Sequence, residues 1–154
     1  EISACLVGSE MCIRDRHKAV KKAASASMRI WYGIFERAAN YAGLDTLDAP
    51  AGWSKPGQEY LDNFTNKGAD VILALSDAAL DAKRAAMRAH ASQIWLADGS
   101  TTRTNPTAAV AALHEPEQVP GAYGLSNLLV MPLLRAEYFQ LGQGEPADDL
   151  LGGL

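Results

Sequence analysis

The strongest structural signal in the sequence is an apolar strand that leads directly into an amphipathic helix. Residues 69–75 form a continuous apolar run broken only by Asp70, a pattern typical of a strand covered on both faces. Ser76 or Asp77 then provides an N-cap for a helix over residues 78–92. The inward stripe of this helix has spacings of three and four and comprises Leu80, Lys83, Met87, His90 and Ile94. A strand followed by such a helix favours a layered α/β architecture.

The rest of the chain continues this alternation less clearly. Residues 28–34 predict a strand and residues 35–42 a helix, with Gly43 placed for a left-handed C-terminal cap. Residues 98–122 are a poorly patterned loop insertion, in which the Asn105-Pro106 pair predicts a short helix over residues 107–113. Helical turns are also predicted at 17–24 and 60–64, strands at 94–96 and 137–141, and an apolar segment at 128–134.

The first sixteen residues limit how much of the chain informs the fold. Leu6 to Arg16 resembles, in all eleven letters, one reading frame of a transposon-type sequencing-library adapter. A secretory signal peptide does not fit, because the apolar run at residues 4–7 is too short and leads into charges; a genuine strand at residues 5–7 is the other reading. We therefore expect residues 1–16 to be an adapter-derived artefact and the chain to be a truncated translation that lacks its N-terminal half.

Composition excludes several classes of protein. The formal net charge of −4 is that of an ordinary acidic surface and gives no reason to expect nucleic-acid or anionic-membrane binding. Both cysteines, Cys5 and Cys12, lie in the suspect segment, so residues 17–154 have no thiol for a disulfide, a metal site or a nucleophile. No apolar run approaches the roughly 18 residues that a membrane span needs. A soluble, cytoplasmic protein is expected.

Little catalytic chemistry is visible in the residues alone. The three histidines, His17, His90 and His114, are far apart and lack zinc-site spacing, and no phosphate-binding or nucleophile-elbow motif is present. His90 lies on the apolar stripe, where a hydrogen-bonded core histidine is the plain expectation. For Lys83 we expect the aliphatic part of the side chain to pack against the core and the ammonium group to reach water.

Two blocks of sequence carry a family resemblance. Residues 83–93 read K-x-x-A-x-x-x-H-x-S-Q, which resembles a helix of the LmbE-like, or PIG-L, family of zinc-dependent de-N-acetylases. The segments 125–127, 132–134 and 137–141, in that order, are similar to the closing part of one branch of this family. That branch removes acetate from N-acetylglucosaminyl-inositol in mycothiol biosynthesis.

The resemblance implies a zinc-dependent hydrolase acting on a small amino-sugar substrate. Zinc in this family is bound by three residues: a histidine and an aspartate of an A-H-P-D-D motif, and the last histidine of an H-P-D-H motif. A second aspartate of the first motif is the general base. The zinc ion activates a water and polarises the amide carbonyl. Neither motif occurs in this sequence, so the resemblance assigns no catalytic residue and no metal ligand. His17 resembles a histidine that follows the second motif, which places the lost ligand at Ile13. His17, Lys83 and His90 are the near-pocket or motif positions that remain.

The resemblance also implies a fold and leaves alternatives open. Residues 17–154 are expected to be the C-terminal portion of a single deacetylase domain with a truncated Rossmann-like layered α/β fold, inactive on its own. Within the family, a mycothiol S-conjugate amidase or another sugar-amide deacetylase is the alternative. A non-catalytic α/β binding or scaffold domain is the alternative from a different class. The DNA upstream of His17 in an intact gene, with or without the two motifs, discriminates between them.

Overall fold

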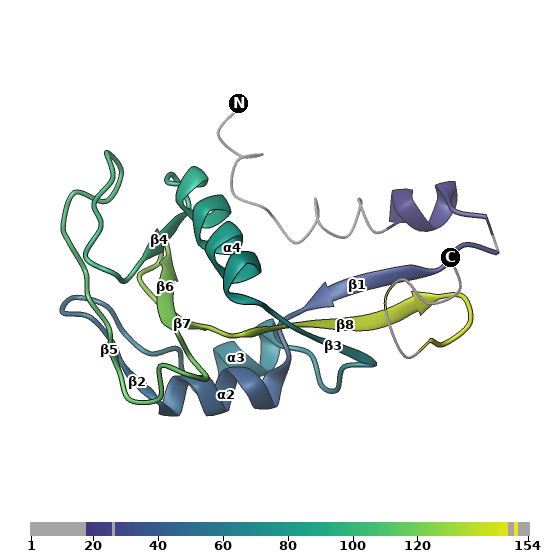
Figure 1. Ribbon diagram of the computed structural model, residues 1–154, viewed down its shortest axis with the longest axis horizontal. Coiled ribbons are helices and arrows are strands. Elements are labelled where there is room, and N and C mark those ends of the chain that lie inside the picture. The colour runs from purple at the N-terminus through teal and green to yellow at the C-terminus, as the bar shows by residue number, and fades with distance from the viewer. Residues whose placement is uncertain (1–17, 26, 148–149, 151–154) are drawn as a thin grey trace. The chain divides into compact units, whose positions relative to one another are not determined.

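The fold is mixed α/β, with helices beside small sheets (Figure 1). The computed structural model describes residues 18–25, 27–147 and 150. The chain divides into two compact units, one formed by residues 33–139 and the other by the residues before 33 and after 139. The elements in chain order are β1 (Ile30–Ile34), α2 (Arg37–Asp45), β2 (Leu47–Asp48), α3 (Gln58–Phe64), β3 (Val71–Ala74), α4 (Asp77–Ala89), β4 (Ile94–Leu96), β5 (Ala112–Leu113), β6 (Gly121–Leu125), β7 (Val130–Leu133) and β8 (Ala136–Gln143).

The sheets are small, and the strand pairs with a described register are antiparallel. The strand orders are β1-β8-β3, β2-β5 and β4-β6-β7. β8 pairs antiparallel with β3, and β6 pairs antiparallel with both β4 and β7. The predicted α/β class is therefore confirmed at the level of mixed helices and strands.

Helix α4 begins as the sequence predicts and ends earlier. The Ser76 side chain accepts a hydrogen bond from the Ala79 backbone N–H, which confirms the predicted N-cap. Leu80 and Met87 are buried, so the part of the predicted apolar stripe that lies within α4 faces the core. The helix stops at Ala89, however, and His90 is its C-cap with an exposed side chain. The prediction that His90 shares the buried face is wrong, because the helical periodicity ends one residue before it.

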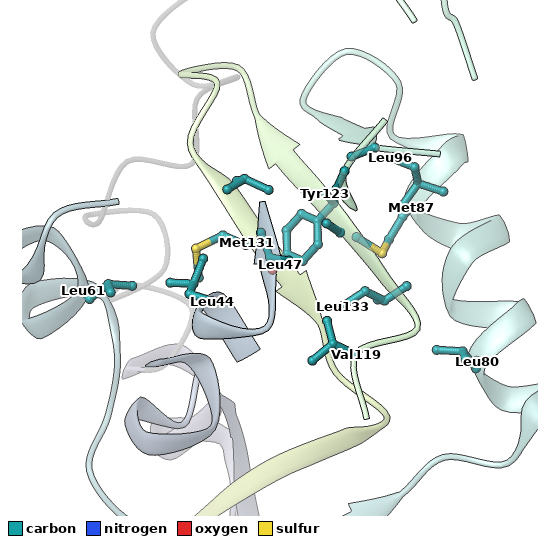
Figure 2. Packing of buried hydrophobic residues seen from close by; sticks show 14 residues of the cluster. Leu44, Leu47, Leu61, Leu80, Met87, Leu96, Val119, Tyr123, Met131 and Leu133 are labelled. Atoms are coloured by element: carbon teal, nitrogen blue, oxygen red, sulfur yellow. The ribbon is translucent and has the colours of Figure 1, made fainter. Parts of the chain in front are cut away.

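The core of the unit formed by residues 33–139 gathers around β6 and β7. Figure 2 shows Leu80, Met87 and Leu96 to one side of Tyr123 and Leu44 and Leu61 to the other. Burial is nearly complete along β7, where all four residues are buried. This core brings side chains from α2, α3 and α4 onto one sheet.

Gly43 has a different role from the one predicted. It lies inside α2, whose C-cap is Thr46, and it does not have a positive φ. A Cβ at this position would lie 2.8 Å from the Cβ of Pro132 and 3.0 Å from a methyl group of Leu134. Glycine is therefore needed for the close approach of α2 to β7 rather than for a left-handed cap.

The insertion at 98–122 is more ordered than its sequence suggests. The predicted helix over residues 107–113 is absent; Ala112 and Leu113 instead form β5, which pairs with β2. The backbone N–H of His114 also donates to the Thr46 carbonyl at 2.7 Å. The local helix signal is overridden because this pairing satisfies the backbone of both segments.

Strand β3 is less covered than its apolar pattern alone indicates. In the described residues it pairs with β8 and forms one edge of its sheet. Val71 is buried, but Ile72 is 62% exposed and Leu73 is 46% exposed. A strand with the pattern of a covered strand, in a chain expected to be truncated, is predicted to leave apolar surface exposed, and the exposure of Ile72 and Leu73 confirms this.

The second unit is a small assembly around the ends of β1 and β8. A helix at residues 18–23 places Lys21 Nζ 5.7 Å from the centre of the Tyr32 ring. The Gln143 amide donates to the carbonyl groups of Ser25 and Met28. In neither unit is any described helix long and apolar enough to cross a membrane.

Candidate functional site

The unit formed by residues 33–139 contains a mostly apolar cavity of about 270 Å³. Residues of α2, α3, α4, β4, β6, β7 and β8 line it, together with Ile34 and Phe35 at the end of β1. Its wall is mostly apolar and includes Phe35, Phe64, Met87, Leu125 and Met131. Such a wall favours an uncharged group over an ion.

One ion pair stands in this apolar wall. Lys83 Nζ on α4 lies 2.6 Å from Glu137 Oε1 on β8, and both residues line the cavity. The Lys83 side chain is 27% exposed and that of Glu137 is 40% exposed. Pairs with this much access to water contribute at most about 1 kcal/mol. The pair therefore orients α4 against β8 more than it stabilises the fold.

Two tyrosines, Tyr123 and Tyr138, also line the cavity. Burial raises the pKa of Tyr123 far above its usual value, and the negative charge of Glu137 raises it further. Burial also raises the pKa of Tyr138, with a second contribution from Glu36. Both phenols are consequently neutral at pH 7 and act as hydrogen-bonding groups rather than bases. The cavity can bind a group, but these tyrosines do not supply a base.

The three residues predicted near the pocket have different positions. His17 lies outside the described residues. Lys83 lines the cavity, where its stem packs and its ammonium finds a carboxylate. His90 is exposed at the C-terminus of α4, does not line the cavity and makes no side-chain hydrogen bond to the described residues. The expectation of a hydrogen-bonded core histidine at this position is therefore wrong.

Glu137 is the residue that sequence reasoning overlooked. It stands at the start of the predicted strand 137–141, within one of the two blocks that carry the family resemblance. A lysine on a stripe predicted to be buried favours an opposite charge nearby, and Glu137 is one of many carboxylates in the sequence that could provide it. That signal was in the sequence, but it does not reveal which carboxylate the fold brings to Lys83.

The described residues do not fit a zinc site. No group of three or more histidine, cysteine, aspartate or glutamate side chains converges anywhere in residues 18–25, 27–147 and 150. The nearest approach to such chemistry is a pair, His114 Nε2 and Asp48 Oδ2 at 3.0 Å, and both side chains are more than half exposed. Since protein zinc sites take three or four protein ligands, this pair is too small a set.

Comparison with known proteins decides the family. The chain is 42% identical over 123 residues, 78% of its length, to the 1D-myo-inositol 2-acetamido-2-deoxy-alpha-D-glucopyranoside deacetylase of Corynebacterium efficiens. It is 44% identical over 107 residues to the protein of the same name from Corynebacterium diphtheriae, which is 68% of the chain. The chain belongs to the family of these deacetylases.

The match covers most of this chain but only part of each relative. A third relative of the same name, from Corynebacterium glutamicum, is 36% identical over 140 residues, or 88% of the chain. The matched residues amount to 39% of the C. efficiens protein, 34% of the C. diphtheriae protein and 46% of the C. glutamicum protein. The chain thus spans about two fifths of the length of these deacetylases. No protein-family model matches the chain.

Proposed function

We propose that this chain is a structural portion of a zinc-dependent deacetylase that removes the N-acetyl group from N-acetylglucosaminyl-inositol in mycothiol biosynthesis. The observation that carries the proposal is the 42% identity over 123 residues to a deacetylase named for that substrate. On this proposal the complete enzyme has a Rossmann-like layered fold and acts in the cytoplasm.

The proposal assigns the chain a supporting role rather than the chemistry. The described residues provide no ligand set for zinc. The zinc ligands and the general base would therefore come from sequence outside the described residues, and no catalytic step is assigned to this chain. Zinc, when bound in such enzymes, activates a water and polarises the amide carbonyl.

What the described residues do contribute is a rigid wall. The Lys83–Glu137 ion pair joins α4 to β8 at the cavity, and the neutral phenols of Tyr123 and Tyr138 lie in the same wall. A wall of this kind holds its neighbours in place and excludes water, which helps a nearby reaction centre keep its geometry. By itself it is inactive.

Two alternatives predict different outcomes. A mycothiol S-conjugate amidase, or another sugar-amide deacetylase, would differ in the amide that is cleaved. A non-catalytic α/β binding or scaffold domain is the second alternative. It is favoured by one observation, that the described residues contain no group of three or more possible metal ligands. Identity to deacetylases along most of the chain weighs against that last reading.

A chimeric enzyme tests the proposal. The 123-residue segment of the C. efficiens deacetylase that matches this chain is replaced by the matching residues of this chain. We expect the chimera to release acetate from N-acetylglucosaminyl-inositol, measured by detection of the free amine. We also expect the mycothiol S-conjugate to be a poorer substrate.

The controls separate folding from function. The parent C. efficiens protein sets the reference rate, and circular dichroism establishes that the chimera is folded. A folded chimera that cleaves neither substrate would favour the scaffold alternative, and preference for the S-conjugate would favour the amidase.

A further inference from the structure

Strand β3 has the composition of an internal strand but the position of an edge strand. Its sequence, Val-Ile-Leu-Ala, contains no charge and no proline. Natural edge strands normally carry such residues, since an unprotected edge invites pairing with another strand. In the described residues β3 has β8 on one side and no strand on the other (Figure 1).

The hydrogen-bonding direction of β3 can be read from its pairing. The Leu75 N–H donates to the Arg135 carbonyl at 3.0 Å, just beyond the register pairs of β3 and β8. Alternate residues of an antiparallel strand direct their backbone groups to the same neighbour. Val71 and Leu73 therefore face β8, whereas Ile72 and Ala74 present their N–H and C=O groups to the outer edge.

Apolar side chains are exposed on both faces at this same edge. Ile72 and Leu73 are consecutive, so their side chains point to opposite faces of the sheet. Their exposed fractions are 62% and 46%. Leu73 lies directly across from Glu137, the partner of Lys83. An added strand at the edge, with the layers that accompany it, would cover both side chains.

We propose that β3 is an internal strand of the complete deacetylase, and that its outer edge pairs with a strand from the part of the relatives that this chain does not match. This inference rests on the proposed function. About three fifths of the C. efficiens protein lies outside the match, which is ample sequence to supply such a strand. The occupant is thus an apolar polypeptide strand of the same enzyme.

A second copy of the chain fits this edge less well. The strand offers only four residues for pairing. A stable interface between separate proteins buries roughly 1,200 Å² or more, which a four-residue edge does not approach. A strand that belongs to the same polypeptide needs no such area, because it is already tethered nearby.

Amide hydrogen exchange in the chimera tests the proposal directly. In an edge strand only alternate amides are bonded, so Val71 and Leu73 would exchange slowly while Ile72 and Ala74 exchange fast. In an internal strand all four amides are bonded. We expect the Ile72 and Ala74 amides to exchange at least about tenfold more slowly in the chimera than in the 154-residue chain. Alternating protection in the chimera would overturn the proposal.

A pair of substitutions gives a second, independent readout. Ile72→Lys is compared with Val110→Lys, because Val110 is similarly exposed at 65% but lies outside β3. In the chimera we expect Ile72→Lys to lower the melting temperature by about 5 °C or more and Val110→Lys by less than about 2 °C. Equal shifts would contradict the proposal.

The remaining outcomes are also decisive. A chimera that does not fold counts against the proposal, since the edge would then not fit the rest of the relative. A 154-residue chain that forms a dimer abolished by Ile72→Lys would identify a second copy as the occupant and overturn the proposal. A chimera that folds with uniform protection but lacks activity would instead contradict the proposed function alone.

Discussion

At the scale of single residues, contacts made in the fold decide roles that the sequence leaves open. Lys83 and Glu137 are 54 positions apart, and the fold brings Lys83 Nζ on α4 to 2.6 Å from Glu137 Oε1 on β8. His90 shows the converse, because α4 ends at Ala89 rather than at the predicted residue 92, which moves the His90 side chain from the expected core to solvent. The charge of Lys83 on a buried stripe could be predicted to need a partner; the identity of that partner could not.

Gly43 allows a precise test of packing at this scale. In Gly43→Ala the new methyl group would meet Pro132 at 2.8 Å and Leu134 at 3.0 Å, so α2 must move away from β7. We expect a loss of about 1–3 kcal/mol in the free energy of unfolding, measured by urea titration. Gly57→Ala is the matched control, because nothing lies within 4 Å of a Cβ there and its φ is −72°. Equal losses in the two variants would refute this account.

At the scale of elements, prediction succeeds where one local signal is strong and fails where pairing decides. The cap at Ser76 and the start of α4 follow from the sequence, since an N-cap acts within three residues. The strand over residues 94–96 and the helix at 60–64 also form, as β4 and α3. The expected helix over 107–113 fails, because β2 pairs with Ala112 and Leu113 from 64 and 66 residues earlier in the chain, a contact that no local pattern contains.

The buried face of α4 should contribute strongly to the stability of the unit formed by residues 33–139. Leu80 is 2% exposed and belongs to the core cluster, whereas Leu73, of the same type, is 46% exposed on β3. In the 154-residue chain, Leu80→Ala should cost about 2–5 kcal/mol through lost burial and a residual cavity, and Leu73→Ala less than about 1 kcal/mol. Thermal unfolding followed by circular dichroism compares the two. Similar costs would show that the burial of Leu80 in the core cluster does not stabilise this unit.

At the scale of the whole molecule, the sequence identifies the family, but the described residues show no catalytic metal site. Identity of 36–44% to three deacetylases is spread over 68–88% of the chain, yet the described residues hold no three-ligand cluster. The mixed α/β class could be predicted, because it follows from local periodicity. The exposure of Ile72 and Leu73 could not be read from their apolar pattern, because coverage depends on which strands lie beside β3.

Zinc binding tests whether the whole chain holds a metal site. We expect the 154-residue chain to bind no stoichiometric zinc after incubation with one equivalent and dialysis, and to release no acetate from N-acetylglucosaminyl-inositol. The physical reason is that, among the residues that the structure describes, the His114–Asp48 pair supplies two ligands where a stable site needs at least three, and both side chains are more than half exposed. Elemental analysis by mass spectrometry gives the zinc content, with the chimera as the positive control at one zinc per chain. Tight one-to-one binding by the 154-residue chain, retained in His114→Ala, would place a complete ligand set elsewhere in this sequence and would return the catalytic chemistry to the chain itself.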